Sequence, residues 1–116
     1  MGLFHYDEEE EFYVANVKGL RFICEEESQE IEEKAQELAE IYESKVPEIV
    51  EFIMEDVVDF WGDISKEELS DALGVPEIDC DIDTLTYVEH TLDDVHIITV
   101  EFDGLLEELL MTSIDG

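Results

Sequence analysis

Basic residues are the scarcest class of side chain in this sequence. Its 116 residues include 5 Lys and Arg against 35 Asp and Glu, which gives a formal net charge of -30. So few cations cannot match a phosphate backbone or an anionic lipid surface, and we expect neither nucleic acid nor membrane as a partner. Such a charge also repels itself, and burial, counterions or a cationic partner must offset that repulsion.

Other hallmarks of membrane, secreted and phosphate-binding proteins are also missing. No stretch approaches the ~18 apolar residues of a membrane span. The opening "MGLFHYDEEEE" has no signal-peptide pattern, and Tyr6 stands where a myristoylation motif needs Ser or Thr. Two cysteines, Cys24 and Cys80, make no disulfide framework, and no glycine-rich phosphate loop occurs. These absences predict a cytoplasmic protein.

The hydrophobic content indicates a folded chain despite the charge. Hydrophobic residues make up 45% of the sequence, which is close to the globular norm and unlike a disordered acidic chain. The length suits one domain over residues 1–116. Adaptation to high salt does not explain the acidity, because Glu outnumbers Asp, Lys outnumbers Arg and Ile is frequent.

Alternating apolar residues predict strands near the start of the chain. "EFYVANVKG" and "LRFICEE" alternate and are joined at Lys18-Gly19. The short segment "LFHY" before them would pair only as an edge strand. The run "DEEEE" then becomes a hairpin loop rather than a free tail. One face of the hairpin would carry Tyr13, Ala15 and Val17, and the other Phe12 and Val14.

The middle of the chain has helical periodicity. Ser28 is a good N-cap for a first helix, whose apolar residues recur at helical spacing: Ile31, Ala35, Leu38 and Tyr42. Proline disfavours helical conformation at the preceding residue, so we expect a second, widely buried helix from about Pro47 to Trp61, stopped by Gly62. "SKEELSDALG" predicts a third, short helix between Ser65 and Gly74. Phe22, Phe52 and Trp61 are expected in the core.

Period-two patterning returns at the end of the chain. "TLTYVEHT" and "VHIITVEF" read as strands joined across residues 92–94, after an acidic connection "VPEIDCDID". Asp103-Gly104 is the strongest hairpin signal, and it favours a strand in "LLEELLMTSI" although its leucines also fit a helix. The predicted class is α+β, with two antiparallel hairpin or meander segments flanking two to three helices and a sheet packed on the helices.

Motifs for metal binding fail at specific positions. Asp79, Asp81 and Asp83 resemble the first three ligands of a calcium loop, but Thr84 and His90 stand where glycine and a bidentate glutamate belong. His90 and His96, beside Asp93 and Asp94, offer zinc-ligand chemistry without a cysteine pair or a helical histidine pair. We interpret these histidines as solvated hairpin residues. No metal and no cofactor is expected.

Catalytic signals are equally weak. Cys24 precedes Glu25, Glu26 and Glu27, whose carboxylates raise a thiol pKa and suppress the nucleophilic thiolate. Glycoside hydrolysis uses a pair of carboxylates, and such pairs are frequent in this sequence. The sequence gives no sign of a substrate cleft, however. We therefore expect no enzymatic activity and no catalytic residue.

The acidic surface is the remaining candidate for function. Glutamates follow the helical period opposite the apolar stripe of the first helix, and Lys34 can pair with Glu30 or Glu37 while little else neutralises this face. A solvated face without a partner would look the same, but the uncompensated charge favours a basic protein partner. The predicted partner-binding residues lie on this helix and at the hairpins: Glu30, Glu33, Glu37, Glu40, Asp93, Asp94 and Asp103.

The C-terminal stretch from Leu85 to Gly116 adds a resemblance. Its features "TYVEHTLDD-HII", "EFDG" and "SIDG" cover about a quarter of the chain. They resemble the end of small acidic bacterial proteins of uncharacterised families that are encoded beside secreted polymorphic toxins. The resemblance implies an immunity protein that neutralises a basic toxin, such as a nuclease, by direct binding. It transfers no catalytic residue. The alternatives are a phage-type DNA mimic that inhibits a DNA-binding protein, and a small acidic metal-responsive or structural module.

Overall fold

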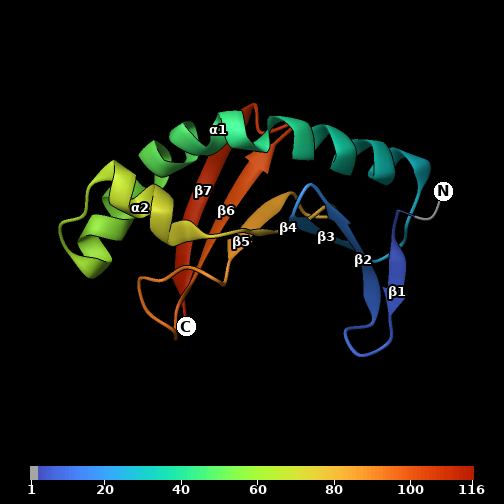
Figure 1. Ribbon diagram of the computed structural model, residues 1–116, viewed down its shortest axis with the longest axis horizontal. Coiled ribbons are helices and arrows are strands. Elements are labelled where there is room, and N and C mark those ends of the chain that lie inside the picture. Colours follow the sequence, from blue (N-terminus) through green and yellow to red (C-terminus); the bar gives the residue numbers. More distant parts are fainter. Residues whose placement is uncertain (1–2) are drawn as a thin grey trace.

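The computed structural model describes residues 3–116, which form one open seven-stranded sheet with a long helix along it (Figure 1). The α+β class is thus confirmed. The strands lie side by side in chain order, and every neighbouring pair is antiparallel except β3 and β4. The elements are β1 (His5–Asp7), β2 (Phe12–Val17), β3 (Leu20–Cys24), α1 (Gln29–Trp61), α2 (Lys66–Leu73), β4 (Glu77–Asp79), β5 (Thr84–Tyr87), β6 (Ile97–Asp103) and β7 (Glu108–Asp115).

Strand β4 joins the two ends of the chain into one sheet. It pairs in parallel with β3, with Phe22 opposite Ile78, and the Cys80 N–H donates to the Ile23 carbonyl at 2.9 Å. A parallel pair needs a long crossover connection, which α1 and α2 supply. Our interpretation of residues 75–83 as a connection alone was wrong for Glu77–Asp79. Three residues are too few to show an alternating pattern.

The predicted break at Pro47 is wrong, because α1 continues through it as one helix of 33 residues. Proline removes its own N–H from the helix and leaves the carbonyl four residues earlier without that donor. Pro47 is exposed, so water can reach this site. Buried side chains on both sides of it, Tyr42 and Ile49, pack in the same core. Tertiary packing of this kind outweighs a local preference.

Helix ends follow the predicted capping chemistry. Ser28 Oγ accepts from the Ile31 N–H at 3.2 Å and begins α1, and Gly62 ends it with a φ of 100°. Ser65 and Glu68 form a reciprocal capping box at the start of α2, with bonds of 3.1 Å in both directions. The short helix expected between Ser65 and Gly74 is therefore confirmed.

The core lies between α1 and the sheet. Phe22, Leu85, Tyr87 and Ile98 of the sheet are fully buried. On the α1 side the buried stripe consists of Ala35, Leu38, Ala39, Tyr42, Ile49, Val50, Ile53 and Val57. The hydroxyl groups of Tyr42 and Tyr87 form a hydrogen bond of 2.7 Å across this interface.

Only part of the predicted aromatic core is buried. Phe22 is inaccessible, as expected, but Phe52 is 37% exposed and Trp61 is only half-buried. The expectation that the second half of α1 is widely buried was therefore wrong. Phe52 falls beside the buried stripe of α1 and not within it.

The acidic run forms the predicted hairpin loop. β1 pairs with β2, with Tyr6 opposite Tyr13, and residues 8–11 connect them. Asp7 organises this turn, since its Oδ1 accepts from the backbone N–H groups of Glu9 and Glu10 at 3.0 and 3.2 Å. The Asx-type turn holds the carboxylates of the run at the tip of the hairpin.

The second predicted hairpin, at Asp103-Gly104, joins β6 to β7. The strand expected in "LLEELLMTSI" is confirmed as β7, which is eight residues long and forms one edge of the sheet. The loop is longer than the two-residue turn, since the last pair is Asp103 with Glu108. Separately, no helix within residues 3–116 has both the length and the apolar character needed to span a bilayer.

Candidate functional site

Three glutamates of the predicted stripe face the β6–β7 turn across a shallow groove. Glu30, Glu33 and Glu37 come from the first turns of α1, and Asp103 comes from the end of β6. The groove has a volume of about 450 Å³, and the rest of its lining is Lys34, Asp83, Gly104 and Leu105. The structure therefore brings Asp103 to the stripe, although about seventy residues separate them in the chain.

The groove is strongly unbalanced in charge. Its lining holds five carboxylates and one ammonium group. Lys34 does not pair with Glu30 or Glu37 as the sequence suggested; it forms an ion pair with Asp83 and donates to the Cys80 carbonyl at 3.4 Å. Lys34 is held on the Asp83 side, and within residues 3–116 the exposed α1 glutamates and Asp103 form no ion pair. We call this lining the acidic groove.

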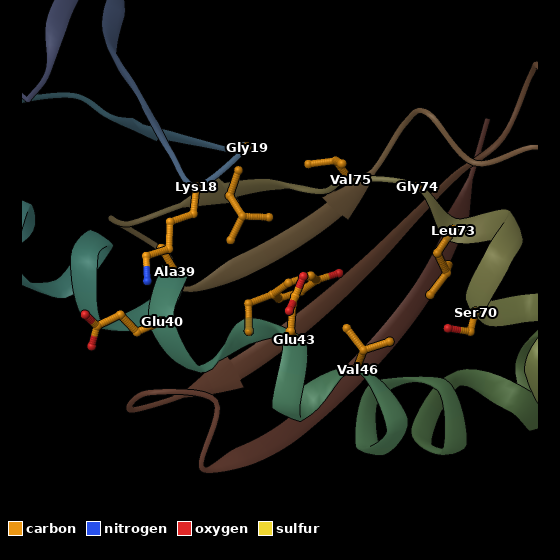
Figure 2. A pocket seen from close by; sticks show the side chains of 12 residues that line it. Lys18, Gly19, Ala39, Glu40, Glu43, Val46, Ser70, Leu73, Gly74 and Val75 are labelled. Atoms are coloured by element: carbon orange, nitrogen blue, oxygen red, sulfur yellow. The ribbon is translucent and has the colours of Figure 1, made fainter.

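Glu40, the fourth residue of the stripe, lies one turn further along α1 and lines a different pocket (Figure 2). This pocket, also about 450 Å³, lies between the middle of α1, the Lys18–Gly19 turn and the end of α2. The sequence did not predict it, because its lining comes from separate elements. The only local signal is Glu43, three residues after Glu40 on the same helix face.

Asp93 and Asp94 lie far from the acidic groove, near the other end of α1. Asp93 already has four donors: its carboxylate accepts from Trp61 Nε1 at 2.9 Å, from His96 Nδ1 at 2.7 Å, and from the backbone N–H groups of Val95 and His96. Desolvation opposes its charge, but these hydrogen bonds outweigh it and hold the pKa of Asp93 well below its ordinary value. Asp94 is exposed beside it.

The two histidines are structural rather than solvated, which corrects the sequence interpretation for His90. His90 is 5% exposed; its Nε2 lies 2.6 Å from the His96 carbonyl oxygen, and its Nδ1 accepts from the Leu92 N–H at 3.2 Å. Both ring nitrogens are thus occupied. Trp61 packs edge-on against His90 and His96, with centroids 5.6 and 6.1 Å apart. This cluster anchors the loop before β6 to the end of α1.

The three aspartates of the calcium-like spacing are also engaged elsewhere. Asp79 Oδ1 accepts from the Asp81 N–H, Asp81 Oδ2 accepts from the Glu25 N–H at 2.7 Å, and Asp83 pairs with Lys34. Within residues 3–116, no group of three or more His, Cys, Asp or Glu side chains is arranged to hold a metal ion. The acids of this segment instead fix the connection between β4 and β5.

Cys24 and Cys80 are buried neighbours on β3 and just after β4. Desolvation, followed by the charges of Asp81 and Glu27, raises the pKa of Cys24 to about 11. Desolvation and the neighbouring Cys24 raise the pKa of Cys80 to about 12. Both shifts disfavour the thiolate, which is the reactive form.

We therefore expect both thiols to be unreactive in the native protein at pH 8. A chromogenic disulfide reagent should release no signal on the time scale of minutes, whereas addition of guanidinium chloride should release two equivalents. One fast equivalent in the native state would show that a thiol is exposed or ionised, against this structure.

The same shifts predict an alkaline limit to stability. The unfolded chain loses its thiol protons near the ordinary value of 9.0, while the native thiols keep theirs to about 11 and 12. Above pH 9 the native state therefore binds more protons than the unfolded state, and the free energy of unfolding falls as pH rises. Urea melts at pH 8 and pH 10 measure this; a Cys24→Ser variant should show a smaller decline.

Comparison with protein-family models, with curated proteins and with solved structures found no match. What this chain does must be inferred from its own geometry and charge.

Proposed function

We propose that this protein binds a basic protein through the acidic groove and the adjoining stripe on α1, as an immunity-type inhibitor of a basic toxin domain. The observation that carries the proposal is the acidic groove, where Glu30, Glu33, Glu37 and Asp103 converge and where, among the described residues of the lining, the one cation is already paired with Asp83. The net charge of -30 extends the same potential over the molecule. The resemblance of residues 85–116 to immunity-type proteins favours a toxin as the target.

Exposed carboxylates on a rigid helix suit this role physically. They keep their hydration until the partner arrives, and their field accelerates encounter with a positively charged surface. The nucleic-acid cleft of a nuclease is such a surface. An inhibitor that covers it blocks substrate without any chemistry of its own, so we propose a binding role and not a catalytic one.

Affinity capture from the producing cell tests the proposal. Immobilised protein at low ionic strength should retain a basic protein, and the apparent dissociation constant should rise steeply with sodium chloride because exposed charge pairs are screened. If the retained protein is a DNA-binding regulator or repair enzyme, the target is that of a DNA mimic. If no basic protein is retained, or if binding is unchanged in molar salt, the proposal fails.

A further inference from the structure

The pocket that Glu40 lines has an apolar floor and an acidic rim (Figure 2). Leu20, Ala39, Tyr42 and Leu73 form the floor, and each of them is buried. Val46 and Val75 extend this apolar surface toward solvent. A volume of about 450 Å³ falls in the range of ligand-binding pockets.

Two carboxylates stand at the rim from one side. Glu40 and Glu43 project from α1; in Figure 2 the carboxylate of Glu43 is turned toward the opening, whereas that of Glu40 points outward on the Lys18 side, away from Glu43. Within residues 3–116, neither glutamate is in an ion pair, and neither is Lys18, the single cation of the lining. The rim therefore carries a net negative charge within the field of a strongly acidic molecule.

We propose that this pocket receives one arginine side chain of the basic partner, an inference that rests on the function proposed above. The methylene stem would lie against Ala39, Val46 and Leu73, as long cationic side chains do on apolar surfaces. The guanidinium group would meet the carboxylate of Glu43, whose two oxygens offer acceptors for its planar set of donors, and Glu40 would add negative charge at the rim. Glu40 also belongs to the stripe, so a partner lying along α1 passes the mouth of the pocket.

The isolated protein allows a direct test with butylguanidinium chloride as the probe. At low ionic strength we expect saturable shifts of the backbone amide signals of Gly19, Ala39 and Gly74, with a dissociation constant on the order of millimolar, since so small a ligand gains little binding energy. Butanol and butyrate should shift these signals far less. A micromolar constant would make the pocket a small-molecule site and overturn its assignment to a partner side chain.

Four variants separate the effect of charge from the effect of shape. The double change Glu40→Gln and Glu43→Gln removes the rim charge, and Glu33→Gln with Glu37→Gln is its matched control in the acidic groove. Ser70→Phe fills the opening from an exposed position of α2 and leaves every charge in place. Lys18→Asn removes the opposing cation at a position with φ 51°, which asparagine tolerates.

The expected pattern is weaker probe binding in the first double variant and in Ser70→Phe, unchanged binding in the control, and tighter binding in Lys18→Asn. Equal loss in both double variants would mean that the probe is drawn to acidic surface in general. Loss of probe binding in Lys18→Asn would mean that Lys18 supports the probe site instead of opposing a cation there. Either result overturns the proposal.

The captured partner then distinguishes failure of this inference from failure of the proposed function. Ser70→Phe should weaken partner affinity about tenfold, as loss of one well-buried anchor does, without changing the dependence on salt. Unchanged affinity would remove the pocket from the interface while the proposed function stands. If there is no partner to capture, the proposed function fails, and the inference fails with it, even where the probe binds.

Discussion

Replacing Glu33, Glu37 and Asp103 by lysine should weaken binding of the basic partner by about 100-fold or more at low salt. Each change replaces an attraction with a repulsion at the acidic groove, and like charges juxtaposed across an interface are strongly disfavoured. The dependence of affinity on sodium chloride should become shallower, because fewer opposite charges are screened. Titration calorimetry across a salt series measures both quantities.

A second triple variant controls for net charge. Glu51, Glu55 and Glu101 are exposed and line none of the groove. Their replacement by lysine makes the same change in charge, so it should lower the association rate through the general field while the dissociation rate stays near that of the parent. Equal losses of affinity in the two variants would show that the acidic groove is not the docking site.

Neither triple variant should harm folding. All six side chains are exposed, and removing negative charge from a chain of net charge -30 reduces self-repulsion. The midpoint of thermal unfolding should therefore hold or rise. A circular dichroism melt of each variant checks this before binding is compared.

The largest effect on stability is expected for Phe22→Ala. Phe22 is inaccessible, and it lies on β3 between Ala15 of β2 and Ile78 of β4. Truncating a buried phenylalanine removes its transfer free energy and leaves a cavity, which costs ~3–5 kcal/mol. Chemical denaturation should show this loss as a lower midpoint with an unchanged slope.

Phe52→Ala is the matched comparison. Phe52 is 37% exposed, so the same truncation leaves no closed cavity and should cost about 1 kcal/mol or less. A similar loss in both variants would mean that Phe52 is buried in solution. That result would restore the wide burial of α1 that its sequence suggested.

Local chemistry in the sequence predicted the ends of the elements well. Ser28, Ser65 and Gly62 act through hydrogen bonds or backbone angles within a few residues, so their effects are visible in a short window. The strands of at least four residues were also found: β2, β3, β5 and β6 from their alternation, and β7 from the Asp103-Gly104 turn that precedes it.

Features that depend on distant residues were missed. Strand β4 forms because it pairs with the edge of β3, and no pattern within Glu77–Asp79 predicts that pairing. The continuity of α1 through Pro47 depends on the core beneath both halves of the helix. In each case tertiary contacts overrode the local preference on which the prediction relied.

In the candidate site, too, local features were predicted from the sequence and features that depend on distant residues were not. The glutamate stripe follows from helical period alone, whereas its approach to Asp103 requires the β6–β7 turn to lie beside the start of α1. Asp93 was predicted as a partner-binding residue because of its charge. The structure shows that its carboxylate accepts hydrogen bonds from Trp61 and from its own loop. The pocket beside Glu40 depends on three separate elements, and no pattern within one of them predicts it.

The net negative charge has a second effect, on self-association of the chain through the outer edge of β7. An eight-residue edge strand, with Leu110 and Met111 about half exposed, is a template on which further copies of the chain could stack. At neutral pH the mutual repulsion of the monomers opposes that stacking. As the carboxylates become protonated near the isoelectric point of about 4.1, this protection disappears and β7 becomes the place where fibrils or precipitates would begin.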